Sequence, residues 1–167
     1  MIRLLVAMER EGEALGALPF PFEVINITGT SIPPISPSDI IVNVGYCGGD
    51  GIAPGTIVEP KAVIDAETGE WTDLPRHFGE AEGVVPALCI TSPTFVTTPL
   101  MTGPAVYDME LARLARISCR ALYTLKIVSD ELNEADCESY SDSSAWSKVR
   151  ELLVSAGLIQ LSAMQPK

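Results

Sequence analysis

The sequence has few of the residues that build metal centres and disulfide frameworks. It contains one histidine, His77, and four cysteines, which lie far apart and include no Cys-x-x-Cys pair. Structural zinc sites use four closely spaced Cys or His ligands, and disulfide scaffolds need regularly spaced cysteines in a short secreted chain. We therefore predict no structural metal, no disulfide and no cofactor.

Basic residues are also scarce. The chain has 11 Lys and Arg residues against 22 Asp and Glu residues, which gives a formal net charge of −11. Such a charge repels a phosphate backbone and an anionic lipid surface alike. We predict that the protein binds neither nucleic acid nor a membrane, and that a small molecule is its partner.

Long hydrophobic runs are missing as well. The apolar run at 1–8 ends at Glu9, too soon for a signal peptide, and no other stretch has the length of a membrane span. The composition, 47% hydrophobic over 167 residues, is enough for one core. We predict a single domain over 1–167, in the cytoplasm, with reduced cysteines.

The pattern of apolar and polar residues predicts a mixed α/β fold. Apolar or β-branched runs predict strands, and helical spacing of apolar residues predicts helices. The expected strands are 2–8, 22–28, 39–44, 84–90 and 122–128, with a hairpin over 56–65 and 70–74. The expected helices are 9–18, 106–121 and 144–156, with a glycine-rich turn at 45–51 and a loop at 132–142. Strands joined by helices, together with an antiparallel hairpin, predict a mixed twisted sheet flanked by helices.

Polar or glycine-bearing segments follow four of the expected strands, at 8–11, 45–49, 91–95 and 129–130. In open α/β sheets, ligands bind in the crevice beyond the carboxyl ends of the strands. We expect these four segments to converge on one ligand site.

Five short motifs in these regions occur in the order of a known family. They are Ala7-Met-Glu-Arg-Glu11, Asn43-Val-Gly-Tyr-Cys-Gly-Gly49, Gly55-Thr-Ile-Val58, Val106-Tyr-Asp-Met-Glu110 and Lys126-Ile-Val-Ser-Asp130. Together they resemble motifs of the methylthioadenosine/S-adenosylhomocysteine nucleosidases, which belong to the nucleoside phosphorylase and nucleosidase superfamily. The resemblance runs from the start of the chain to about Asp130, and it implies the three-layer α/β/α fold of that superfamily.

The resemblance implies two catalytic residues. Glu11 matches the carboxylate that positions and deprotonates the attacking water. Asp130 matches the acid that protonates the leaving purine, so that the base departs neutral. Each also has a structural explanation, since an acid suits a helix N-terminus and an aspartate suits a strand-end turn.

The resemblance implies a substrate-binding set around these two residues. Glu110 matches the carboxylate that accepts hydrogen bonds from the ribose hydroxyls, and Met109 matches the side chain against the sugar. Phe95 matches the ring that stacks on the base, and Val96 the residue whose backbone meets the edge of the base. Gly48, whose backbone borders the sugar, and Ser129 complete the set.

The sequence departs from the family between its second and third expected strands. The family has a long crossover helix there, whereas this chain has only the proline-rich segment 29–37. Prolines cannot propagate a helix, so one crossover helix is missing. Because that helix contributes to subunit contacts in the family, the homodimer that the resemblance implies is an open expectation. Lys126 also stands where the family has arginine.

These observations favour hydrolysis of the N-glycosidic bond of a purine nucleoside. A futalosine-type hydrolase shares the same motif order. A phosphorylase would need arginines around a phosphate dianion, and the chain offers few. The alternative from another class is a non-catalytic nucleoside-binding protein that has kept the fold.

Overall fold

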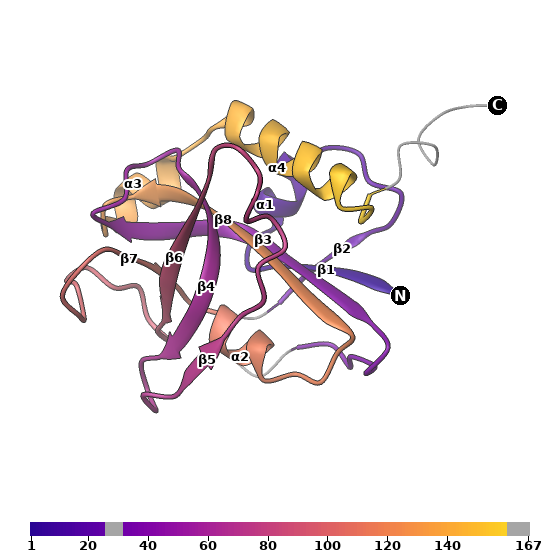
Figure 1. The fold of residues 1–167 in the computed structure, drawn as a ribbon. Coiled ribbons are helices and arrows are strands. Elements are labelled where there is room, and N and C mark those ends of the chain that lie inside the picture. The colour runs from indigo at the N-terminus through magenta and orange to yellow at the C-terminus, as the bar shows by residue number, and fades with distance from the viewer. Residues whose placement is uncertain (26–31, 160–167) are drawn as a thin grey trace.

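The computed structural model describes residues 1–25 and 32–159, which form a mixed sheet with helices on both sides (Figure 1). Its strands are β1 (Ile2–Val6), β2 (Phe22–Val24), β3 (Ile40–Asp50), β4 (Ile57–Asp65), β5 (Trp71–Asp73), β6 (Val84–Thr91), β7 (Ala105–Asp108) and β8 (Ala121–Asp130). Its helices are α1 (Glu9–Ala14), α2 (Leu111–Ala115), α3 (Glu134–Ser139) and α4 (Ser143–Ser155). The predicted α/β class with a mixed, helix-flanked sheet is confirmed.

Five of the strands close into a ring. β3 pairs with β7, β7 with β6, β6 with β4, and β4 with β8, which returns to pair along β3. β1 extends the sheet from β3 and carries β2 on its other edge, with both pairs parallel. β5 forms the predicted antiparallel hairpin with β4. The ring therefore brings the ends of strands that are distant in sequence close together.

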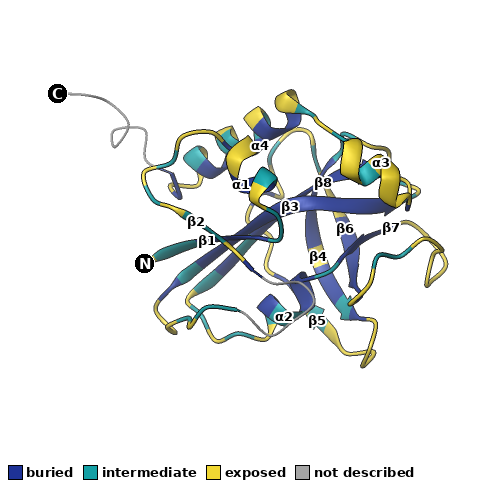
Figure 2. Ribbon diagram, turned by 180° about the vertical axis from the view of Figure 1, so that it is seen from behind, coloured by how far each residue is buried: buried dark blue, intermediate teal, exposed yellow. Residues whose placement is uncertain are grey.

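Two apolar clusters hold the helices against this sheet. One contains the buried face of α4, with Trp146, Val149 and Leu153, packed against β1, β3 and β8. The other packs Leu111 and Leu114 of α2 against residues of β3, β4 and β6. Figure 2 shows the ring strands as mostly buried, whereas α3 is exposed along most of its length.

Helix α4 matches its predicted range closely. Its N-cap is Asp142, whose side chain accepts a 3.1 Å hydrogen bond from the backbone N–H of Ala145. The chain leaves the helix at Gly157, which has a φ of 79°. The Asp142 cap and Gly157 thus define the ends of this helix.

The predicted glycine-rich turn at 45–51 is wrong, because β3 continues through it to Asp50. Its glycines serve close approach instead of chain reversal. A Cβ on Gly45 would lie 2.6 Å from an oxygen of Glu11, and one on Gly49 would lie 2.4 Å from the carbonyl oxygen of Ile52. Any larger residue at these positions would push its neighbours away from the strand.

The predicted helix over 106–121 is also wrong. Its first part is the strand β7, in which Val106 and Tyr107 are buried between β3 and β6. Only Leu111–Ala115 is helical, and the side chain of Asp108 accepts a 2.8 Å hydrogen bond from the N–H of Leu111 at its start. The pairing of β7 with β3 on one edge and β6 on the other outweighed the helical spacing of apolar residues in this segment.

Further boundaries differ from the predictions. The helix predicted over 9–18 ends at Ala14, and the strand predicted over 2–8 ends at Val6. The segment 132–142, predicted as a loop, contains α3, which is capped by Asn133 through a 2.9 Å hydrogen bond from the N–H of Asp136. The predicted strand 22–28 is a strand only at Phe22–Val24, and its last residues lie outside the described ranges. The described part of the connection to β3, residues 32–39, contains no helix.

Candidate active site

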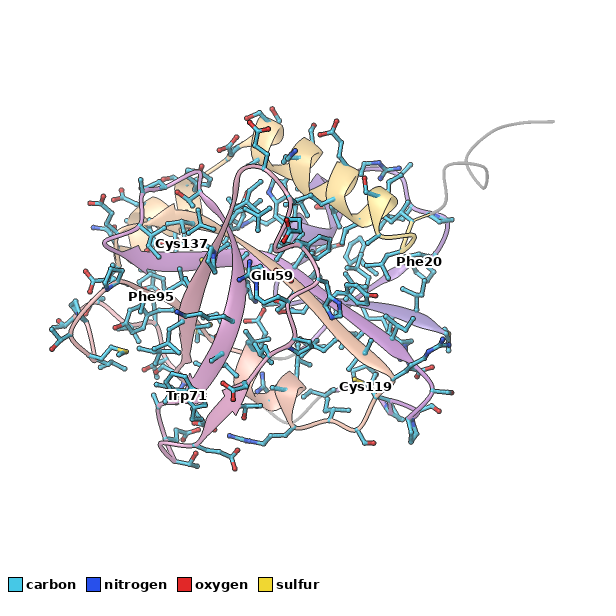
Figure 3. The ribbon with its side chains drawn as sticks, in the orientation of Figure 1. Phe20, Glu59, Trp71, Phe95, Cys119 and Cys137 are labelled. Atoms are coloured by element: carbon cyan, nitrogen blue, oxygen red, sulfur yellow. The ribbon has the colours of Figure 1, made fainter. Side chains whose placement is uncertain are left out.

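A cavity of about 220 Å³ lies at the carboxyl ends of β1 and β7, beside the second half of β3. Its lining comes from α1 and the residues before it, from the second half of β3, from the end of β7 and from one face of α3. Of the predicted site residues, Glu11, Gly48, Phe95, Met109 and Glu110 all line it. Figure 3 labels Phe95 and Cys137, which lie at the same end of the molecule and both line this cavity.

Glu11 is held at the cavity by three backbone N–H groups. One carboxylate oxygen accepts hydrogen bonds from Ala7 at 3.1 Å and Met8 at 2.9 Å, and the other accepts one from Tyr46 at 2.7 Å. The side chain is 1% exposed. Burial and the nearby Glu110 raise the pKa of Glu11 to about 7, against the opposing effect of these hydrogen bonds and of Lys126. A carboxylate with that pKa suits a general base near neutral pH.

Glu110 belongs to a buried cluster of charges beside Glu11. Its Oε2 lies 3.0 Å from the ammonium of Lys126, which lies 3.2 Å from a carboxylate oxygen of Asp108. The side-chain amide of Asn43 also donates to Glu110, at 3.4 Å. Lys126 is fully buried, so its charge is balanced by carboxylates alone.

The pKa values in this cluster follow from burial and from neighbouring charge. Burial raises the pKa of Glu110, whereas Lys126 lowers it, and the net direction is upward. Burial alone would lower the pKa of Lys126, but Glu110 and Asp108 raise it above its ordinary value. Lys126 is therefore a fixed positive charge that keeps two adjacent carboxylates inside the fold.

Asp130 and Ser129 do not line this cavity. They line an open hollow on the neighbouring surface, together with residues of α3 and the segment after it. The two oxygens of Asp130 accept hydrogen bonds from the hydroxyl of Ser129 at 2.6 Å and from the N–H of Asn133 at 3.0 Å. A Cβ on Gly48 would lie 3.3 Å from an oxygen of Asp130, so the acid lies next to one residue of the cavity wall. Three of the four segments expected to converge thus reach the cavity, and the fourth lines the neighbouring hollow, with Asp130 next to Gly48.

Val96 lines a second, much smaller space. This gap of about 20 Å³ is bordered by Gly48, Phe95 and Met109, which also line the main cavity, and by Val96 and Leu132, which do not. The gap and the cavity are therefore neighbours. Phe95 borders both of them.

Asp108 and the charge cluster are site features that the sequence motifs do not predict. Asp108 accepts a 2.6 Å hydrogen bond from the hydroxyl of Thr91, which itself accepts one from the N–H of Ala112 at 3.0 Å. A usable signal was present, because Asn43, Thr124 and Lys126 interrupt strands that are otherwise apolar. In the parallel pairing of β3 with β8, Asn43 lies opposite Thr124 and Gly45 opposite Lys126.

Several structural findings bear on metals and membranes. The cysteines Cys47, Cys89, Cys119 and Cys137 are free thiols. Within residues 1–25 and 32–159, no cluster of His, Cys, Asp and Glu has an arrangement that could hold a metal ion. No helix among those residues is long and apolar enough to cross a membrane.

Comparison with known proteins places the fold. No protein-family model matches the chain, and no curated protein is similar to it in sequence. Among solved structures, it is similar to a Chlamydia trachomatis MTAN bound to adenine, at 15% identity and a TM-score of 0.66, over 93% of this chain and 94% of that one. It is also similar to the S. pneumoniae 5′-methylthioadenosine/S-adenosylhomocysteine nucleosidase with a transition-state inhibitor, at 15% identity and a TM-score of 0.67, over 94% and 98% of the two chains.

A variant of the C. trachomatis protein bound to MTA is similar as well, at 16% identity and a TM-score of 0.66, over 93% and 94% of the two chains. This chain therefore has the fold of the methylthioadenosine/S-adenosylhomocysteine nucleosidases. The resemblance drawn from its five motifs is confirmed at the level of the fold. The similarity extends beyond Asp130 into the segment that carries α3 and α4.

Proposed function

We propose that this protein hydrolyses the N-glycosidic bond of a purine nucleoside. The observation that carries the proposal is that Glu11 and Glu110, one fitted to act as a base and the other to bind hydroxyls, line one cavity together with Met109 and Phe95. The solved structures with this fold include proteins bound to adenine and to MTA. Adenine and methylthioadenosine are therefore the first compounds to test.

In the proposed reaction, Glu11 accepts a proton from water as the water attacks the anomeric carbon of the sugar. The three N–H groups on Glu11 hold its carboxylate in one orientation. Glu110, held by Lys126, accepts hydrogen bonds from the sugar hydroxyls. The bond from the anomeric carbon to the base nitrogen breaks, and Asp130 supplies a proton to the base, which leaves neutral. Met109 lies against the sugar and Phe95 against the base.

The charges at the cavity favour water over phosphate as the nucleophile. Its lining has five acidic residues and one basic residue, namely Glu11, Asp108, Glu110, Glu134, Glu138 and Arg10. The Arg10 guanidinium already donates to the carbonyls of Tyr140 at 3.0 Å and Cys137 at 2.8 Å. An acidic lining repels a phosphate dianion, so phosphorolysis is disfavoured.

The test is release of free base from methylthioadenosine, S-adenosylhomocysteine, adenosine and futalosine, followed by chromatography with and without phosphate. We expect base release that does not depend on phosphate, and loss of release in Glu11→Gln. Release that requires phosphate would indicate a phosphorylase. No base release from any of these nucleosides would contradict the proposal.

A second function is favoured by the position of Asp130 outside the cavity. If the acid cannot reach the base, the site binds a nucleoside without cleaving it. Calorimetry with adenine and methylthioadenosine measures binding, which both functions require. A binding protein would leave methylthioadenosine uncleaved after long incubation, whereas a hydrolase would release its base.

A further inference from the structure

Leu132 has an unusual backbone conformation. Among the described residues it is the one non-glycine residue with a positive φ, at 64°. Such a conformation is sterically unfavourable for a leucine and is adopted freely by glycine. The residue follows Asp130 closely in the turn between β8 and α3, and Asn133 next to it caps α3. The surrounding structure therefore holds Leu132 in place against its own preference.

The Leu132 side chain points inward from this turn. It is 8% exposed and packs with Ile90, Ala105 and Tyr107, close to Val96. Its Cδ2 lies 2.9 Å from the position that a Cβ on Gly48 would take, beside the carboxylate of Asp130. Leu132 and Asp130 thus lie against the same glycine of β3.

This placement leaves little room beside Phe95. The gap that Leu132 borders with Gly48, Phe95 and Val96 measures about 20 Å³. A gap of that size holds about one water molecule and cannot hold a bicyclic base. Phe95 and Val96 are the residues expected to meet the base, and Asp130 is the acid expected to protonate it.

We propose that Leu132 restricts the binding of the base at the proposed nucleoside site, because its side chain occupies space beside Phe95, the residue expected to stack on the base. The inference rests on the proposed function. A purine enters this space only when the Leu132 side chain moves aside, so Leu132 weakens the binding of purines relative to a smaller residue. If the opened form makes up about 10% of the molecules or less, the apparent affinity is lowered at least about tenfold.

The experiment measures adenine binding by calorimetry to the full-length protein and to four variants. Leu132→Ala and Leu132→Gly remove the side chain, and glycine also suits the positive φ. Leu132→Asn is the matched control for backbone strain, because asparagine tolerates this conformation and keeps four non-hydrogen side-chain atoms with the same branching. Leu122→Ala is the control for a core truncation elsewhere, since Leu122 is also buried but packs in the cluster under α2.

We expect adenine to bind Leu132→Ala and Leu132→Gly at least about tenfold more tightly than the wild type. We expect no gain in Leu132→Asn or Leu122→Ala. Equal adenine affinity in all five proteins would overturn the inference, and so would a gain in Leu132→Asn as large as in Leu132→Ala. Should Leu132→Ala be too unstable to purify, Leu132→Gly provides the same comparison.

Base release from methylthioadenosine, measured on the same proteins, separates this inference from the proposed function. If the truncated variants bind adenine more tightly but no protein releases base, the role of Leu132 is supported and hydrolysis is refuted. If the wild type and Leu132→Ala both release base with the same KM for methylthioadenosine, hydrolysis is supported and the role of Leu132 is refuted. Adenine binding to none of the proteins, together with no base release from any of them, would refute both.

Discussion

The Glu11 carboxylate accepts a 2.7 Å hydrogen bond from the backbone N–H of Tyr46, which ties α1 to the middle of β3. The contact is possible because Gly45, next to Tyr46, has no side chain in the way. Tyr46 is itself anchored, since its hydroxyl accepts a 2.8 Å hydrogen bond from the indole N–H of Trp146 in α4. The candidate base is thus positioned by the core of the protein.

The pH dependence of activity tests the role of Glu11. A general base acts in its ionised form, and burial together with Glu110 raises the pKa of Glu11 to about 7. We therefore expect kcat/KM for methylthioadenosine to rise as the pH increases through about 7, as Glu11 ionises. Initial rates between acid and mildly alkaline pH measure this profile. Glu11→Gln should lose about 10²- to 10⁴-fold in rate, with no such rise, and an unchanged profile in that variant would contradict the assignment.

Asp130→Asn tests protonation of the leaving base. Asparagine keeps the shape of the side chain: its one oxygen can still accept the hydrogen bond from the N–H of Asn133, and its NH2 group can donate to the hydroxyl of Ser129, but it cannot supply the proton. We expect turnover to fall about 10²- to 10⁴-fold, with little change in Tm and with adenine still bound. Single-turnover rates and thermal melts provide the comparison. A variant as fast as the wild type would show that another group is the acid.

Lys126→Met tests the buried charge cluster. The substitution leaves Asp108 and Glu110 buried without their shared cation, and removing one partner of a buried ion pair costs about 3–5 kcal/mol. We expect a loss of that order in the free energy of unfolding, measured by urea titration. Adding Glu110→Gln should recover part of the loss, because it removes one of the unpaired carboxylates. Full stability in Lys126→Met alone would argue that the cluster is not ionised.

Gly45→Ala tests the close contact between β3 and Glu11. Its new Cβ would lie 2.6 Å from an oxygen of Glu11 and would displace that carboxylate from its three N–H donors. We expect a rate loss of about 10²-fold, because a displaced catalytic group no longer matches the reacting atoms. The control is Gly79→Ala, where the nearest atom to a new Cβ is 3.5 Å away in the Arg76 side chain. Equal activity in the two variants would count against the proposed position of the base.

Predictions that depend on neighbouring residues and predictions that depend on distant strands had different outcomes. The ends of α4 were predicted closely, because Asp142 and Gly157 act on the backbone next to them. The helix predicted over 106–121 was wrong, because Val106 and Tyr107 pair with strands that are distant in the sequence. Local signals fix local structure, whereas pairing depends on partners that a single window does not contain.

The sequence by itself determined the α/β class, the hairpin, α4 and the order of the motifs that point to a nucleosidase fold. Tertiary structure alone decided that Lys126 balances Asp108 and Glu110, that Asp130 lies next to Gly48, and that Leu132 borders a small gap with Phe95. The reason is physical. Apolar periodicity and capping depend on neighbours along the chain, but a cavity and the ion pairs at its wall exist only after a closed ring of strands has brought remote side chains within a few ångströms.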